Sequence, residues 1–190
     1  MSNLSEQSAG QRLQTAINAN NHTSIRSLIQ NDKIDVNTRM HGMGWNGMTA
    51  LFYATLHNKP IVVDILLELG ADPTLVHQGA TPLFIAGYYC HLACLKIFAK
   101  HGVDLNMKGP GIHNTAIDGV AMYHPSPIAR QKETFIFLLQ HVSTNDELVS
   151  LLSRYPQYSA DIRSEGRRRA KLREAKKLWK IKPEHKDKQN

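Results

Sequence analysis

One segment of the sequence occurs twice at a fixed spacing. The residues GMTALFYA at 47–54 return as GATPLFIA at 79–86, which is 32 residues later. The similarity continues downstream, because ELGADP at 68–73 matches KHGVDL at 100–105 with the same offset. A period of this length indicates one supersecondary unit that buries its apolar face against its neighbours, which predicts a solenoid.

Each copy carries the signals of a tight turn followed by two short helices. Thr49 and Thr81 are placed to cap the first helix, and Pro82 sits in its first turn, where proline is well tolerated. Pro60 opens the second helix in the same way, and Gly70 is placed to end it in the left-handed conformation. These signals predict an all-α repeat fold in which each helix pair follows a tight turn.

The motifs resemble those of the ankyrin repeat family. Its pattern is a Gly-x-Thr-Pro-Leu-His-x-Ala turn and helix, a Gly-His step, an apolar second helix and a Gly-Ala-Asp end, and the match is close over residues 45–108. Both copies replace the histidine of the first motif, with Phe52 and Phe84, which predicts apolar packing at that position. The resemblance implies an ankyrin-type solenoid of helix pairs with β-hairpin-like turns that binds another protein and is not an enzyme.

Weaker copies on both sides of this core set the expected domain boundaries. We predict a disordered N-terminus at 1–10 and an ankyrin repeat domain at 11–155, with repeats at 11–44, 45–76, 77–108 and 109–142 and a closing helix at 144–154. Thr23 is the expected cap of the second helix, and Ser143 or Thr144 that of the closing helix. Residues 156–190 form a basic C-terminal extension, expected to be helical from about 161 to 180 with Gly166 as a weak point.

Composition and charge limit the class of protein. A chain of 190 residues that is 42% hydrophobic and 21% charged has the balance of a folded domain. Two cysteines do not make a disulfide framework, and no signal peptide or long apolar run is visible, so we expect a cytoplasmic monomer. Twelve Lys/Arg and four Asp/Glu lie between Arg163 and Asn190, which leaves a net charge of −1 for residues 1–162. The basic character of the protein therefore belongs to its C-terminal extension.

The resemblance also places the partner-binding surface. In the family, partners are held by the hairpin tips and the concave face of the first helices. Large apolar and aromatic side chains occupy these positions here, and such residues dominate interface energetics. An alternative reading is that some of them pack against the next repeat as core. The candidate contacts are Trp45, Asn46, Met48, Leu56, His57, His77, Gln78, Tyr88 and Tyr89.

The segment AGYYCHLACLK at 86–96 suggests chemistry, because Cys90, His91 and Cys94 lie within five residues. In the repeat frame Cys90 takes the glycine position between the helices, His91 matches the family's histidine, and Cys94 takes a core position. Tetrahedral zinc would need a fourth ligand that this segment lacks. No catalytic motif accompanies the scattered histidines, so we expect no catalytic, cofactor-binding or metal-binding residues.

A second function class rests on the basic extension. Its cations suit nucleic-acid phosphates, an anionic lipid surface or a nuclear import signal, and they also fit a solubilising tail. The residues concerned are Arg167, Arg168, Arg169, Lys171, Arg173, Lys176 and Lys177. By resemblance alone, the whole protein would be an adaptor, an inhibitor or an effector delivered into a host cell, with a cytoplasmic, nuclear or host location accordingly.

Overall fold

The structure is a computed structural model that describes residues 8–40, 47–110, 115–122, 128–142 and 144–181, with the backbone alone at 128 and 175–181. The chain divides into two compact units, residues 1–141 and 142–190. In the described residues the secondary structure is helical apart from one antiparallel hairpin, β1 (Arg39–Met40) and β2 (Met48–Thr49). The predicted all-α repeat fold with hairpin-like turns is confirmed.

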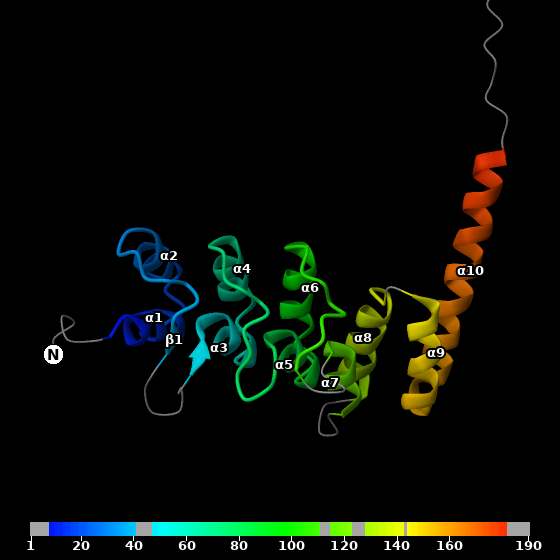
Figure 1. Cartoon of the computed structure of the whole chain (residues 1–190), viewed down its shortest axis with the longest axis horizontal. Coiled ribbons are helices and arrows are strands. Elements are labelled where there is room, and N and C mark those ends of the chain that lie inside the picture. The colour runs from blue at the N-terminus through cyan, green and yellow to red at the C-terminus, as the bar shows by residue number, and fades with distance from the viewer. Residues whose placement is uncertain (1–7, 41–46, 111–114, 123–127, 143, 182–190) are drawn as a thin grey trace, which may run out of the picture. The chain divides into compact units, whose positions relative to one another are not determined.

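The described part of the first unit contains helix pairs arranged in two rows. The pairs are α1 (Ala9–Asn18) with α2 (His22–Gln30), α3 (Ala50–Leu56) with α4 (Pro60–Glu68), α5 (Pro82–Tyr88) with α6 (Leu92–Lys100), and α7 (Ala116–Met122) with α8 (Ile128–Leu139). The inner helices α1, α3, α5 and α7 contact one another in succession, and so do the outer helices α2, α4 and α6 (Figure 1). This succession is the stacking that the repeat predicts.

Helix starts in the second and third pairs follow the predicted signals. The hydroxyl of Thr49 accepts a hydrogen bond from the Phe52 amide at 3.2 Å, and that of Thr81 accepts from the Phe84 amide at 3.1 Å. Pro60 and Pro82 occupy the first turns of α4 and α5. Since the caps satisfy amides that have no partner inside the helix, these short helices start at fixed residues.

Two predictions for the first repeat are wrong. Residues 8–10 do not belong to a disordered terminus, because Ser8 and Gln11 form a capping box and α1 starts at Ala9. Gly10 is buried against β1, where an added Cβ would lie 3.2 Å from the Met40 Cα. The cap of α2 is Asn21, whose side chain accepts from the Ser24 amide at 3.0 Å, and not Thr23.

The turns within the first three helix pairs share one backbone conformation. Asn20, Asn58 and Cys90 have φ values of 50°, 49° and 53°, in the left-handed region. Cys90 therefore occupies the glycine-type step that the repeat frame assigned to it, although an ordinary side chain is disfavoured there. Gly70 and Gly102 follow the ends of the outer helices α4 and α6 by two residues, and their φ values are 87° and 72°. The equal turns keep successive pairs in the same register.

Among the described glycines, Gly87 of α5 and Gly119 of α7 come nearest to the backbone of another helix. A Cβ added at Gly87 would lie 2.0 Å from the Ala116 carbonyl oxygen, and one added at Gly119 would lie 2.7 Å from the Phe84 oxygen and the Tyr88 nitrogen. Glycine is thus required on both helices for the backbones to approach. This contact fixes where the C-terminal end of α5 lies.

The outer helices are joined by ion pairs between repeats. Arg26 of α2 contacts Glu68 of α4 at 2.6 Å. Asp64 of α4 accepts from Lys100 at 2.9 Å and lies 2.6 Å from His101 Nε2. Hydrogen bonds from His101 first, and then from Lys100, lower the pKa of the Asp64 carboxyl. Ion pairs at the protein surface each add little to the free energy of unfolding. We therefore infer that these pairs fix the register of successive repeats and contribute little to overall stability.

The second unit consists of α9 (Asn145–Arg154), a single 3-10 turn (Pro156–Tyr158) and α10 (Ser159–Ile181). Thr144 and Glu147 form a capping box at the start of α9, as predicted for Thr144. Leu148, Leu151 and Ile162 are buried, and α9 packs on α10. The closing helix therefore groups with the C-terminal extension, which differs from the expected boundary at 155. No helix in the described residues is long and apolar enough to span a bilayer.

The glycine contact yields a direct test. We predict that Gly87→Ala destabilises the protein by roughly 2–3 kcal/mol, because the added methyl overpacks the interface of α5 and α7. Urea unfolding followed by circular dichroism measures the change. The matched control is Gly166→Ala in α10, where an added Cβ meets nothing within 4 Å. Gly166→Ala should stabilise α10 by up to about 1 kcal/mol. Equal free energies of unfolding for the two variants would contradict the close approach of α5 and α7.

Candidate protein-binding face

The inner helices α3, α5 and α7 end in equivalent positions. Each has seven residues, and their last residues are Leu56, Tyr88 and Met122. Leu56 and Tyr88 are half-buried, whereas Met122 is 53% exposed. Because the helices stack in register, we name these three residues the inner-helix row. Two of them were predicted as contacts, and both lie at the predicted ends of their helices.

Sequence reasoning missed Met122, although a signal for it exists. Ile117 of α7 takes the place of Leu51 and Leu83 in α3 and α5, and all three are buried. Counting five residues on from each of them reaches the inner-helix row. The weak similarity of the fourth repeat obscured this register.

Four rings surround the C-terminal end of α5 and form what we name the α5 aromatic cluster. Tyr88 stacks on Phe84 with ring centroids 6.0 Å apart, and it meets Tyr89 edge-on at 5.1 Å. Tyr89 in turn stacks on His91 at 5.7 Å. All four residues are half-buried. The rings therefore order one another and still present part of their surface to solvent.

A hydrogen bond links the end of α3 to this cluster. His91 Nδ1 lies 2.9 Å from the Thr55 carbonyl oxygen, which can only accept, so Nδ1 carries the proton. Burial lowers the pKa of His91. His57 caps the end of α3 and packs against Tyr53 with centroids 4.3 Å apart. Burial first, and then the charge of Lys59, lower the pKa of His57. Because the ordinary pKa of an imidazole already lies below 7, both imidazoles are mainly neutral at pH 7.

The hairpin tips form a second group of predicted residues. His77 is half-buried and meets the ring of Phe52 edge-on at 5.2 Å, while Gln78 is exposed in the left-handed region at φ 48°. Phe52 is 3% exposed, which confirms apolar packing at the position where the family has histidine. Met48 is half-buried in β2. Trp45 and Asn46 lie outside the described residues.

Arg39 was not predicted, yet it connects the two tips. Its Nη1 donates to the Gly47 oxygen at 2.6 Å and to the Val76 oxygen at 3.2 Å. The Arg39 guanidinium thus joins the base of the first hairpin to the segment that precedes His77. An arginine beside a Gly-rich turn gave no distinct signal in the sequence.

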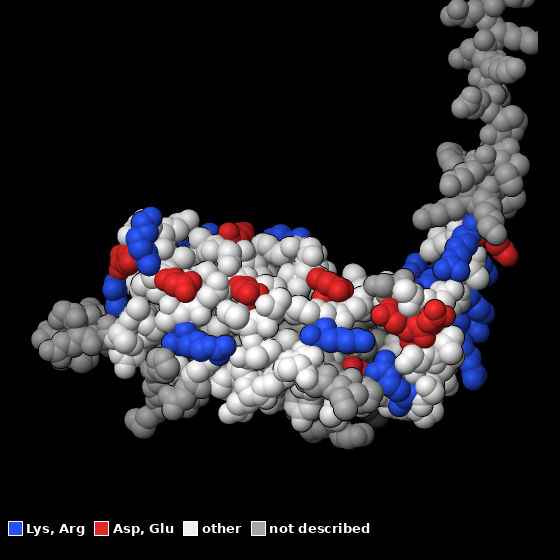
Figure 2. All heavy atoms as spheres, in the orientation of Figure 1, with Lys and Arg blue, Asp and Glu red and all other residues white. Residues whose placement is uncertain are grey.

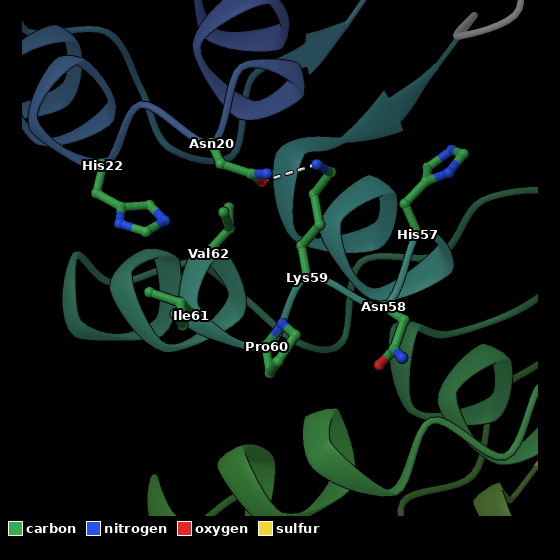
Figure 3. A pocket seen from close by; sticks show the side chains of 8 residues that line it. All are labelled: Asn20, His22, His57, Asn58, Lys59, Pro60, Ile61 and Val62. Carbon is green, nitrogen blue, oxygen red and sulfur yellow. Dashed lines mark hydrogen bonds between the residues drawn. The ribbon is translucent and has the colours of Figure 1, made fainter.

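A pocket of about 460 Å³ lies beside the turns of the first two helix pairs. Lys59 Nζ donates to Asn20 Oδ1 at 2.8 Å along its wall, and Pro60, Ile61 and Val62 supply apolar surface (Figure 3). His22 and His57 lie at opposite ends of it in this view. Among the described residues that line the pocket, none is a carboxylate, a cysteine or a serine.

The Cys-His-Cys segment serves packing. Cys94 is fully buried, and its thiol lies 3.6 Å from Asn58 Oδ1 of the preceding repeat. Burial raises the pKa of the Cys94 thiol to about 12. Cys90 is buried in the turn, and His91 is engaged by Thr55. Across the described residues, no three His, Cys, Asp or Glu side chains are grouped as metal ligands.

The predicted basic residues are divided by the structure. Arg168 and Arg169 both bind Glu165, at 2.7 and 2.9 Å. Arg167, Lys171 and Arg173 are exposed on α10. The side chains of Lys176 and Lys177 lie outside the described residues.

Comparison with known proteins agrees with this architecture. The family described as ankyrin repeats matches residues 13–109 in three copies, which is 97 of the 190 residues. The mouse (Mus musculus) protein NF-kappa-B inhibitor delta is similar to this chain, with 35% identity over 63 residues. That alignment covers 33% of this chain and 19% of the relative, so the chain spans less than a fifth of the length of that protein.

The burial of Cys94 predicts low thiol reactivity. With a pKa of about 12, roughly one Cys94 thiol in ten thousand is ionised at pH 8, and the thiolate is the reactive form. We expect Cys94 to react with a chromogenic disulfide reagent far more slowly in the native protein than in denaturant. A Cys90→Ala variant isolates the Cys94 signal. Equal rates in the native and denatured states of that variant would contradict the assigned core position.

Proposed function

The chain belongs to the ankyrin repeat family, and from this we propose that it is a non-enzymatic module that binds another protein through its inner-helix row and hairpin tips. The observation that carries the proposal is the inner-helix row with the adjoining α5 aromatic cluster. These are apolar and aromatic side chains that repeat stacking aligns and leaves partly exposed. Surfaces of this kind are characteristic of protein interfaces.

The geometry of the aromatic cluster supports tight binding. Tyr88 and Tyr89 are already held edge-on by each other, and Phe84 and His91 support them from either side. A partner that covers them therefore orders few additional rotamers, which reduces the entropic cost of association. Tyrosines at the centre of an interface lose about 2 kcal/mol or more of binding energy when truncated to alanine.

The mode of action that fits such a module is occupation of a partner's surface. The mouse relative is named as an inhibitor, and blocking a surface is one way in which a binding module inhibits. The same face equally serves an adaptor that holds two proteins together. The described cysteines are free thiols, which supports a reducing compartment such as the cytoplasm as the place of action.

The proposal is tested by comparing binding partners of matched variants. Full-length protein, a Tyr88→Ala/Tyr89→Ala variant and an Ile61→Ala/Lys96→Ala variant are expressed in the native cell, captured and analysed by quantitative mass spectrometry. Ile61 and Lys96 are exposed on the outer helices α4 and α6, so the second variant controls for loss of surface area elsewhere.

We expect at least one protein to be captured by the wild type and the outer-helix control, and to be depleted tenfold or more with the tyrosine variant. Circular dichroism and unfolding curves establish that both variants are folded. Identical partner lists for all three proteins would contradict the proposed face.

A further inference from the structure

We propose that one side of α10 binds the phosphate backbone of a nucleic acid through Arg163, Arg167 and Lys171, which we name the basic row. This function is separate from protein binding by the repeats and does not depend on it. The sequence pattern alone does not distinguish among the cations of the extension, and Arg163 is not among the candidate residues that it suggested. The structure separates those that are engaged within the protein from those that are available.

The basic row follows from the helical period. Its members are four residues apart, so they lie on one side of α10 and rise about 6 Å along the axis at each step. All three residues are exposed. Figure 2 shows Lys and Arg side chains gathered along this helix. The result is a line of positive charge with regular spacing.

On the other side of α10, two arginines are engaged by an acid of the same helix. Glu165 is 6% exposed and receives hydrogen bonds from Arg168 and Arg169 at 2.7 to 2.9 Å. The Arg169 side chain is only 15% exposed, so it is committed to this contact. Among the described residues, by contrast, no ion pair joins the basic row to a carboxylate. Its three charges are therefore available to a ligand.

The net charge of the helix agrees with an anionic ligand. Residues 159–174 contain six Lys or Arg and three Asp or Glu, which gives a net charge of +3. Of the acids, Glu165 is buried in its own ion pairs, and Glu174 lies one turn beyond Lys171 on the side of the basic row.

The character of the row favours a nucleic acid over a membrane. An interfacial membrane helix needs a wide apolar side beneath its cations. Among the described side chains of α10, Leu172 is the one large apolar group that is exposed, at 48%, and Ile162 is buried. Guanidinium groups bind phosphate oxygens in a bidentate manner, and two of the three cations are arginine. An evenly spaced row of charges also complements a polymer whose charges are evenly spaced.

Fluorescence anisotropy on the full chain tests the proposal, with a labelled 20-base-pair DNA duplex and a labelled single-stranded 20-nucleotide RNA as probes. The test variant is Arg163→Gln/Arg167→Gln/Lys171→Gln, in which glutamine keeps the helix propensity. The control is Lys33→Gln/Lys96→Gln/Lys108→Gln, which removes the same charge from exposed positions of the first unit.

We expect wild type and control to bind one or both probes at 50 mM salt. For duplex DNA, the three contacts should contribute about 2.7 to the slope of log affinity against log salt, and the test variant should lose that part. The affinity of the test variant at 50 mM salt should fall tenfold or more. The probe that the wild type binds more tightly identifies DNA or RNA as the source of the phosphates.

Several results would overturn the proposal. These are no binding of either probe at 50 mM salt, equal losses in the test and control variants, or preferential binding to phosphatidylserine vesicles. A polyglutamate peptide that binds more tightly than either nucleic acid would also overturn it and would indicate an acidic protein partner.

Discussion

Burial of the inner helices between their neighbours is the constraint on which the first unit depends. A seven-residue helix such as α3 or α5 is too short to be stable alone, and its apolar side chains find partners only on the adjacent pairs. Leu51, Leu83 and Ile117 are buried at the same position of successive helices. At α5 and α7 the contact is so close that both helices carry glycine where the backbones meet. Hydrogen bonds and ion pairs between repeats then fix the register.

The candidate face is a consequence of that register. Stacking that buries one side of each inner helix also aligns the residues that end the helices, so Leu56, Tyr88 and Met122 fall in a row. The same stacking brings His91 against Thr55 of the preceding pair and thereby orders the rings around Tyr89. Packing and the proposed binding function thus depend on the same interface, and a change that opens α5 from α7 would disturb both.

Much of the fold could be predicted because its signals are local. Threonine caps, first-turn prolines and the 32-residue period place most helices before any contact is known. The candidate site was harder to predict from the sequence. Tyr88 and Tyr89 are half-buried because each packs against another ring, that of Phe84 before the turn and that of His91 after it. The role of Arg39 depends on the carbonyl groups of Gly47 and Val76, and Val76 lies 37 residues away in the sequence. The division of the basic residues on α10 depends on the burial of Glu165, an acid that resembles any other in the sequence. Asn21, and not Thr23, is the cap because α2 starts at His22, two residues earlier than a cap at Thr23 would allow.

Hydrogen–deuterium exchange on the chain with and without its captured partner tests the central claim most directly, because it locates the contact surface without altering a residue. The account predicts slower exchange in the complex for amides at the C-terminal ends of α3 and α5, for the turn before His91 and for the hairpin tip at His77 and Gln78, with the outer helices α4 and α6 unchanged. Slower exchange confined to α4 and α6, or to the second unit, would contradict it.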